Sequence, residues 1–205
     1  MLQPTIARGA SAEVEISRSR FVATAHRIAS LDELASLVRE TRRAHPDSRH
    51  VCSAAIVGPH GESSRSNDDG EPAGTAGSPI LSAIAGRGLT DVAVLVVRWF
   101  GGVKLGTGGL VRAYGGIAAD ALDAAGRLER VAATEFVALL PHADAPRLEH
   151  ALRSAGHEPT LSYEAAGARL TIVVEDARRA EADALLAQLG IAAVPAGARV
   201  LERAG

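Results

Sequence analysis

The stretch RWFGGVKLGTGGLVRAYGG, residues 98–116, decides how the first half of the chain is organised. It follows the apolar run Val92–Val97, which is typical of a strand buried on both faces. Apolar residues recur at helical spacing from the middle of the stretch onward, and this predicts a helix that ends near Gly126. The sequence therefore predicts a strand, a glycine-dense turn and a helix in succession.

A glycine-dense turn that leads into a helix is typical of phosphate-binding sites. Glycines allow close backbone approach, and a helix N-terminus presents free N–H donors, so we expect a phosphate nest at residues 106–109. Aromatic and cationic side chains around the turn suit the recognition of phosphate or acidic groups. The residues that we expect to bind phosphate or a partner surface are Arg98, Lys104, Gly106, Thr107, Gly108, Gly109, Arg112 and Tyr114.

The same stretch also has a purely structural interpretation. It is not a P-loop, which needs a Lys and a Ser or Thr directly after the last Gly, and it does not follow the dinucleotide-binding pattern. Glycines in a turn often serve backbone geometry alone, and Trp99 and Phe100 are also consistent with core positions at a strand end. Lys104 is distinctive, because the chain has 22 basic residues and every other one is arginine.

A second segment, NDDGEPAGTAG at residues 67–77, concentrates carboxylates just before a predicted helix. Like charges so close together repel one another unless cations or backbone N–H groups offset them. One interpretation is an acidic turn that caps the helix; a calcium loop is disfavoured, because oxygen ligands do not occur at the alternate positions that an EF-hand needs. Our hypothesis is that the acidic loop, Asp68, Asp69 and Glu71, faces the cations Arg98, Lys104 and Arg112 across one groove.

Hydrophobic patterns place further elements in the first half. Ser30 is a suitable N-cap for a helix that the His45-Pro46 pair ends. After a turn at residues 58–61, a long polar connection is expected to lead to the next helix. The expected elements are strands at 14–16, 21–25 and 50–57, and helices at 31–44 and 78–85.

The pattern changes near Arg130. Strand and helix signals then follow in the order β-α-β-β-α-β within about seventy residues, which is the order and size of a ferredoxin-like sandwich. We therefore expect an α+β protein with two domains, residues 1–130 and residues 131–205. The elements expected in the second domain lie at 136–140, 145–154, 160–163, 170–174, 177–189 and 198–201.

Residues 67–77 and 98–114 together resemble the signature of the IMPACT family, also called YigZ-like. Weaker similarity at residues 19–23 and in the strand that begins at His50 extends the resemblance over residues 15–125. It implies that the first domain has the fold of the second domain of ribosomal protein S5, and that the second domain is ferredoxin-like. Asn67 and Trp99 stand where the family commonly has Ser and Tyr, and neither departure removes a charge.

The resemblance also implies a function. Both folds recur on ribosomes and RNA, whereas eukaryotic relatives regulate translation initiation through an added N-terminal region that this sequence does not show. We expect a non-enzymatic, translation-associated binding or regulatory protein that contacts the ribosome, RNA or a translation factor through the acidic and glycine-rich segments. The alternative is a nucleotide- or phosphate-binding enzyme in which Asp69 or Glu71 holds a metal and Lys104 meets phosphate.

Composition narrows the classes of function. A net charge of -2 argues against a general DNA-coating protein, and an aromatic content of 3% argues against stacking platforms for single strands. The single cysteine, Cys52, the lack of a leader signal and the lack of a long apolar run predict a cytoplasmic protein without a membrane span. The acidic second domain is expected to serve protein contact, and a homodimer is one option.

The sequence offers no constellation for catalysis. None of the seven histidines forms a zinc-protease arrangement, so we expect no catalytic residues, no metal site and no cofactor. His50 and Cys52 lie two apart on a predicted strand and would share a face, which leaves a cysteine-based site conceivable. A cysteine in such a strand is more often a small core residue.

Overall fold

The computed structural model describes residues 2–204, and these divide into two compact units. The first unit comprises residues 2–129 together with residues 203–204, and the second comprises residues 130–202. Each unit has its own buried apolar core and contains both helices and strands, so the chain is a mixed α+β protein, as expected.

The sheet of the first unit has five strands, every neighbouring pair of which is antiparallel. Its order is β2-β3-β6-β4-β5. Ser17 and Arg18 both have positive φ and form the two-residue turn between the first two strands, a geometry that matches strand twist. The strands are β2 (Ala10–Ile16), β3 (Ser19–Arg27), β4 (His50–Val57), β5 (Ser63–Asn67) and β6 (Val92–Trp99).

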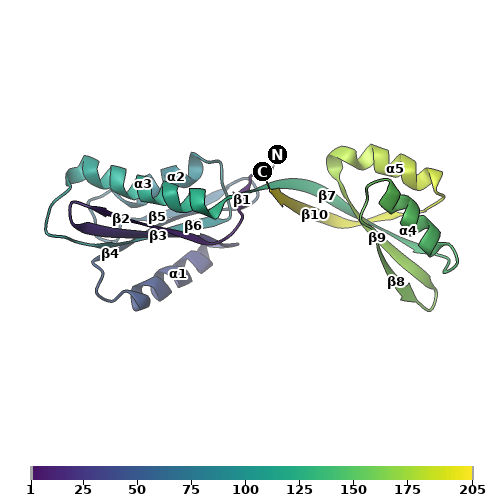
Figure 1. The fold of residues 1–205 in the computed structure, drawn as a ribbon, viewed down its shortest axis with the longest axis horizontal. Coiled ribbons are helices and arrows are strands. Elements are labelled where there is room, and N and C mark those ends of the chain that lie inside the picture. The colour runs from purple at the N-terminus through teal and green to yellow at the C-terminus, as the bar shows by residue number, and fades with distance from the viewer. Residues whose placement is uncertain (1, 205) are drawn as a thin grey trace. The chain divides into compact units, whose positions relative to one another are not determined.

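Helices cover both faces of this sheet (Figure 1). On one face lies α1 (Leu31–Ala44), and on the other lie α2 (Gly77–Ala85) and α3 (Gly106–Ala125). Successive side chains of a strand point to opposite faces. The central strand β6 accordingly sends Val92, Val94 and Val96 to the core under α2 and α3, and the alternate residues to the core under α1. This confirms the predicted strand that is buried on both faces.

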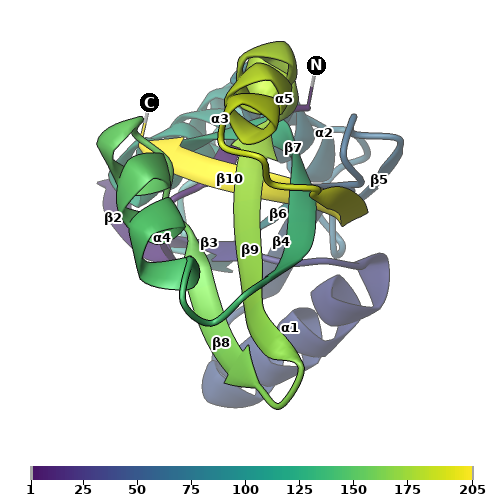
Figure 2. The same cartoon turned by 90° about the vertical axis from the view of Figure 1, so that its right-hand side faces the viewer.

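The second unit follows the element order β-α-β-β-α-β. Its sheet has the order β8-β9-β7-β10. Strand β7 begins in the first unit, where its first two residues pair with β1 (Thr5–Ile6). Both helices pack against one face of the sheet and share one core with it (Figure 2). The elements are β7 (Arg127–Leu140), α4 (Ala145–Ser154), β8 (Thr160–Glu164), β9 (Gly167–Glu175), a 3-10 turn (Asp176–Arg178), α5 (Arg179–Gln188) and β10 (Val194–Ala204).

Two expectations about the first unit need correction. The polar connection after residue 61 contains strand β5, which pairs with β4 and forms an edge of the sheet. The helix was expected from the middle of the glycine-rich passage onward, but α3 begins earlier. Gly106–Gly109, the residues expected to form the phosphate nest, are the first turn of this helix. Every helix within residues 2–204 is too short or too polar to cross a membrane.

Candidate functional site

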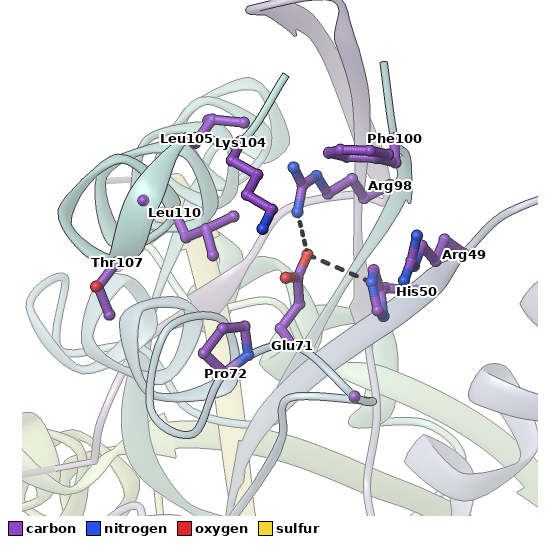
Figure 3. Close-up of a pocket in the computed structure, with 12 residues that line it drawn as sticks. Arg49, His50, Glu71, Pro72, Arg98, Phe100, Lys104, Leu105, Thr107 and Leu110 are labelled. Carbon is purple, nitrogen blue, oxygen red and sulfur yellow. Dashed lines mark hydrogen bonds and ion pairs between the residues drawn. The ribbon is translucent and has the colours of Figure 1, made fainter. Parts of the chain in front are cut away.

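A pocket of about 430 Å³ lies in the first unit, where the end of β6 and the start of α3 meet the acidic segment. It is formed by residues from three stretches that are far apart in the sequence, within residues 49–50, 70–72 and 98–110 (Figure 3). The residues that line it are Arg49, His50, Gly70, Glu71, Pro72, Arg98, Phe100, Lys104, Leu105, Gly106, Thr107 and Leu110.

A buried ion pair between Glu71 and Arg98 forms one wall of the pocket. Glu71 Oε1 accepts a hydrogen bond of 2.6 Å from Arg98 Nη1 and one of 2.7 Å from the Tyr114 hydroxyl. The side chains of the pair are only 4% and 5% exposed. Arg98 Nη2 also donates to Ser19 Oγ. A buried charge needs such partners, so this network holds both side chains in fixed positions.

The pairing of β4 with β6 brings His50 to the same pair. His50 and Arg98 are cross-strand partners, and His50 Nε2 lies 3.8 Å from Glu71 Oε1. The backbone carbonyl of Asp69 can only accept a hydrogen bond, so His50 Nδ1 donates to it at 2.7 Å. Positive φ angles at Asp69 and Gly70 turn the acidic segment so that Glu71 reaches this position.

The other two carboxylates of the acidic segment lie elsewhere, so the hypothesis of one acidic face opposite three cations is wrong for them. Asp69 pairs with Arg42 of α1 and accepts from the backbone N–H of Val51. Asp68 accepts backbone hydrogen bonds from Gly74, Ala76 and Gly77 at the start of α2. Its carboxylate therefore caps this helix, which is the structural interpretation given above for the acidic turn. Burial alone would raise the pKa of Asp68, but these hydrogen bonds outweigh it and lower the pKa below its ordinary value.

Lys104 lies at the rim of the pocket beside the start of α3. It is exposed, and within residues 2–204 its ammonium has no ion pair or hydrogen bond. Leu105 is the N-cap of α3 and makes no side-chain cap, so side chains leave the first N–H groups of the helix free. Gly106 has a positive φ of 70°, which an L side chain would resist. A free ammonium and an open helix N-terminus both favour an anion.

Four residues expected on the binding surface do not line this pocket: Gly108, Gly109, Arg112 and Tyr114. Tyr114 is fully buried, and burial raises the pKa of its hydroxyl, so it acts as a neutral donor to Glu71. Arg112 is exposed and lines a neighbouring hollow together with Lys104 and Gly109. Gly108 lies in the first turn of α3, next to Gly109 in the sequence.

Cys52 is a core residue. Its side chain is fully buried, and its Sγ donates to the carbonyl oxygen of Asp68 at 3.1 Å. Burial raises the pKa of the thiol to about 12. Because the thiolate is the nucleophile, this environment does not support a cysteine-based reaction at neutral pH.

Arg49 and Phe100 line the pocket, although neither was among the residues expected to bind phosphate or a partner. Phe100 is 41% exposed, and the guanidinium carbons of Arg49 and Arg98 lie 5.6 Å and 5.5 Å from its ring centroid. The backbone N–H of Arg49 donates to the carbonyl of Arg98, which fixes its place beside β6. Only the register between β4 and β6 brings Arg49 to this site, and the sequence does not state that register.

Comparison with known proteins identifies the family. The model of the Impact N-terminal domain matches residues 17–122, which is more than half of the chain. The chain belongs to the IMPACT family. The pocket, the acidic segment and the glycine-rich stretch all lie inside the matched region.

Relatives in several bacteria support this membership. An IMPACT family member of Thermus thermophilus is 42% identical over 157 residues, which cover 77% of this chain and 84% of that protein. YvyE of Bacillus subtilis is 38% identical over 62% of this chain and 58% of its own length, and YigZ of Escherichia coli is 40% identical over 60% and 61%. The matched part of this chain thus spans only about three fifths of these two relatives.

One solved structure is similar to this chain in fold over nearly its whole length. A crystal structure of a hypothetical protein aligns with 95% of this chain and 97% of its own, at 31% identity and a TM-score of 0.63. A structure of the two-domain translational regulator Yih1 aligns with 60% of this chain and 45% of its own, at 26% identity. Its TM-score of 0.34 is too low to support an inference from that protein to this IMPACT family chain.

Proposed function

We propose that this IMPACT family protein is a non-enzymatic, translation-associated binding protein that holds phosphate groups of RNA in the pocket at the start of α3. The observation that carries the proposal is the unpaired ammonium of Lys104 beside the open N-terminus of that helix. Arg49 adds a second cation without an acidic partner in the described chain. With Arg98 and Glu71 included, the charged side chains of the lining sum to +2, counting histidine as neutral.

The link to translation rests on the family resemblance and on two finer fold assignments, which we also propose. The first unit is assigned the fold of the second domain of ribosomal protein S5. The second unit is assigned a ferredoxin-like fold, and its sheet order and the two helices on one face support this. Fold analogy alone is a weak warrant for function, so the site chemistry carries the argument.

A salt titration of RNA binding tests the proposal. Structured ribosomal RNA and whole ribosomes are titrated with the full chain, with Lys104→Ala and with Arg43→Ala, which removes an exposed charge from α1. Loss of one phosphate contact should weaken binding uniformly and reduce the salt slope by about one, for Lys104→Ala only. Unchanged affinity and slope in Lys104→Ala would refute a phosphate role. Binding to an acidic translation factor but not to RNA would also contradict the proposal.

A metal-dependent nucleotide enzyme is less well supported. That alternative needs Asp69 or Glu71 free to hold a metal, but Asp69 is paired with Arg42 and Glu71 with Arg98. Thermal stabilisation of the protein by ATP and Mg²⁺ together, beyond that by ATP alone, would favour the enzyme.

A further inference from the structure

One carboxylate oxygen in the pocket, Oε2 of Glu71, has no hydrogen-bond partner within residues 2–204. All of the polar contacts that the structure gives the Glu71 side chain, from Arg98, Tyr114 and His50, are made to Oε1. Within residues 2–204, Oε2 accepts no hydrogen bond, although the side chain is only 4% exposed. Figure 3 shows this oxygen on the side of Lys104, whose ammonium points toward it. Solvent in the pocket reaches this oxygen, and a ligand that supplies a hydrogen-bond donor can take the place of the solvent there.

The charge of the lining selects the kind of anion. Arg49, Arg98 and Lys104 against Glu71 leave +2, and the N-terminus of α3 adds a partial positive charge. A phosphomonoester carries about -1.5 to -2 at neutral pH, because its second pKa is about 6. An internal phosphodiester or a single carboxylate carries only one negative charge. The balance therefore favours a terminal phosphate over a phosphate within a strand.

The apolar and aromatic residues of the pocket indicate which chemical group is attached to the phosphate. Phe100 presents an exposed aromatic ring, and Pro72, Leu105 and Leu110 supply apolar contacts. A volume of about 430 Å³ lies at the lower end of the range for small-molecule sites, so it suits one nucleotide rather than a strand. A nucleobase offers both a flat apolar surface and N–H donors for Glu71 Oε2.

We propose that the pocket binds a single nucleotide that carries a terminal phosphate. Lys104 and the first N–H groups of α3 hold the phosphate, and Glu71 Oε2 accepts a hydrogen bond from the exocyclic amine of the base. This deepens the proposed function and rests on it, since it names which phosphate the site recognises. The shared chemistry is that of a nucleoside monophosphate, whether free or at the 5′ end of an RNA.

Calorimetric titration of the full chain tests the proposal. The probes are AMP, adenosine, and two RNA oligonucleotides of one sequence with a 5′-phosphate or a 5′-hydroxyl end. We expect AMP to bind about tenfold more tightly than adenosine or better, and Lys104→Ala to remove that difference. Preference for the 5′-phosphorylated oligonucleotide over AMP would identify an RNA end as the ligand, and the reverse would identify a free nucleotide.

A second comparison tests the role of Glu71. Purine riboside 5′-monophosphate lacks the amine of AMP and should bind about fivefold to tenfold more weakly to the unaltered chain. Glu71→Gln, with folding verified by circular dichroism, should abolish this preference, and if it fails to fold, the two ligands are compared on the unaltered chain alone. Equal binding of the two ligands to the unaltered chain would overturn the role of Glu71.

The failures of the two proposals are distinguishable. Equal binding of AMP and adenosine, or equal binding of both oligonucleotides with a loss in Lys104→Ala, would overturn the terminal-phosphate proposal. The second of these results would leave the proposed RNA-binding function intact. Binding of AMP without any binding of RNA or ribosomes would support the nucleotide site and refute the proposed function.

Discussion

At the scale of single residues, the site depends on one buried carboxylate. Glu71 joins the acidic segment, β6 and α3, because its Oε1 receives hydrogen bonds from Arg98 and Tyr114. Both charges of the pair are nearly inaccessible to solvent. Removing either partner leaves the other as an uncompensated buried charge, which is among the most destabilising changes in proteins.

Glu71→Ala should lower the free energy of unfolding by about 3–5 kcal/mol, because Arg98 would then be buried without its counter-ion. Urea denaturation followed by circular dichroism measures the change. The matched control is Glu13→Ala, which removes an exposed partner of Arg20 and should have little effect. Similar losses in both variants would show that burial of the pair does not matter.

The sequence could predict which residues meet at the site only in part. Lys104 and the glycines could be found, because a lone lysine and a dense run of glycines stand out in the chain. The partner of each carboxylate in the acidic segment could not be predicted. The backbone turns at Asp69 and Gly70, so neighbouring side chains there point in different directions. Charge alone does not distinguish a helix cap from an ion pair.

At the scale of elements, patterns with strong local signals were predicted well. Ser30 does cap α1, its hydroxyl accepting from Glu33 N–H, and β4 runs from His50 to Val57. The signals for β5 are absent, because the sequence SSRSN has no apolar residue, and only pairing with β4 makes it a strand. The N-terminus of α2 likewise depends on a distant carboxylate, that of Asp68, rather than on its own N-cap Ala76.

Asp68→Ala should cost about 1–2 kcal/mol of stability, comparable to the loss of an N-cap. Since the pKa of Asp68 is lowered in the folded state, its contribution is fully present above the ordinary pKa of about 4 and is lost as pH falls through the lowered value. Urea denaturation at several pH values measures this. Asp68→Asn keeps an acceptor for Gly77 but does not titrate, so it should remove this part of the pH dependence. An unchanged acid profile in Asp68→Asn would contradict the assignment.

The loop between β6 and α3 depends on close backbone packing at Gly101. A Cβ at this position would lie 1.8 Å from the carbonyl oxygen of Arg18, in the turn between β2 and β3. Gly101→Ala should therefore destabilise the first unit by about 3 kcal/mol, as overpacking does. Gly116→Ala on α3 meets nothing within 4 Å and should stabilise by up to about 1 kcal/mol. Thermal melts of both variants measure the contrast, and an unaffected Gly101→Ala protein would refute it.

At the scale of the whole molecule, the two units have separate cores. The clusters that contain Ile80 and Leu95 lie within residues 2–129, and the cluster that contains Leu170 lies within residues 130–202. We propose that they are two domains with a boundary near Arg130. The element order of the second unit could be predicted from the sequence, because its strands alternate apolar and polar residues over a single helix-covered face.

Scanning calorimetry of the full chain tests this division. Leu170→Ala and Ile80→Ala each remove a buried side chain from one core, at an expected cost of about 2–5 kcal/mol. Each variant should lower one of two melting transitions and leave the other in place. A single transition that moves in both variants would show that the units unfold together.

The composition of the chain gives Lys104 a practical use. It carries the only side-chain amine of the protein, and that amine stands exposed at the rim of the pocket. Acylating reagents selective for primary amines therefore have one side-chain target, and a fluorophore attached there would report directly on events at the mouth of the pocket. Protection of this amine from acylation would serve as a footprint, by which fractions of a cell extract can be screened for whatever occupies the site.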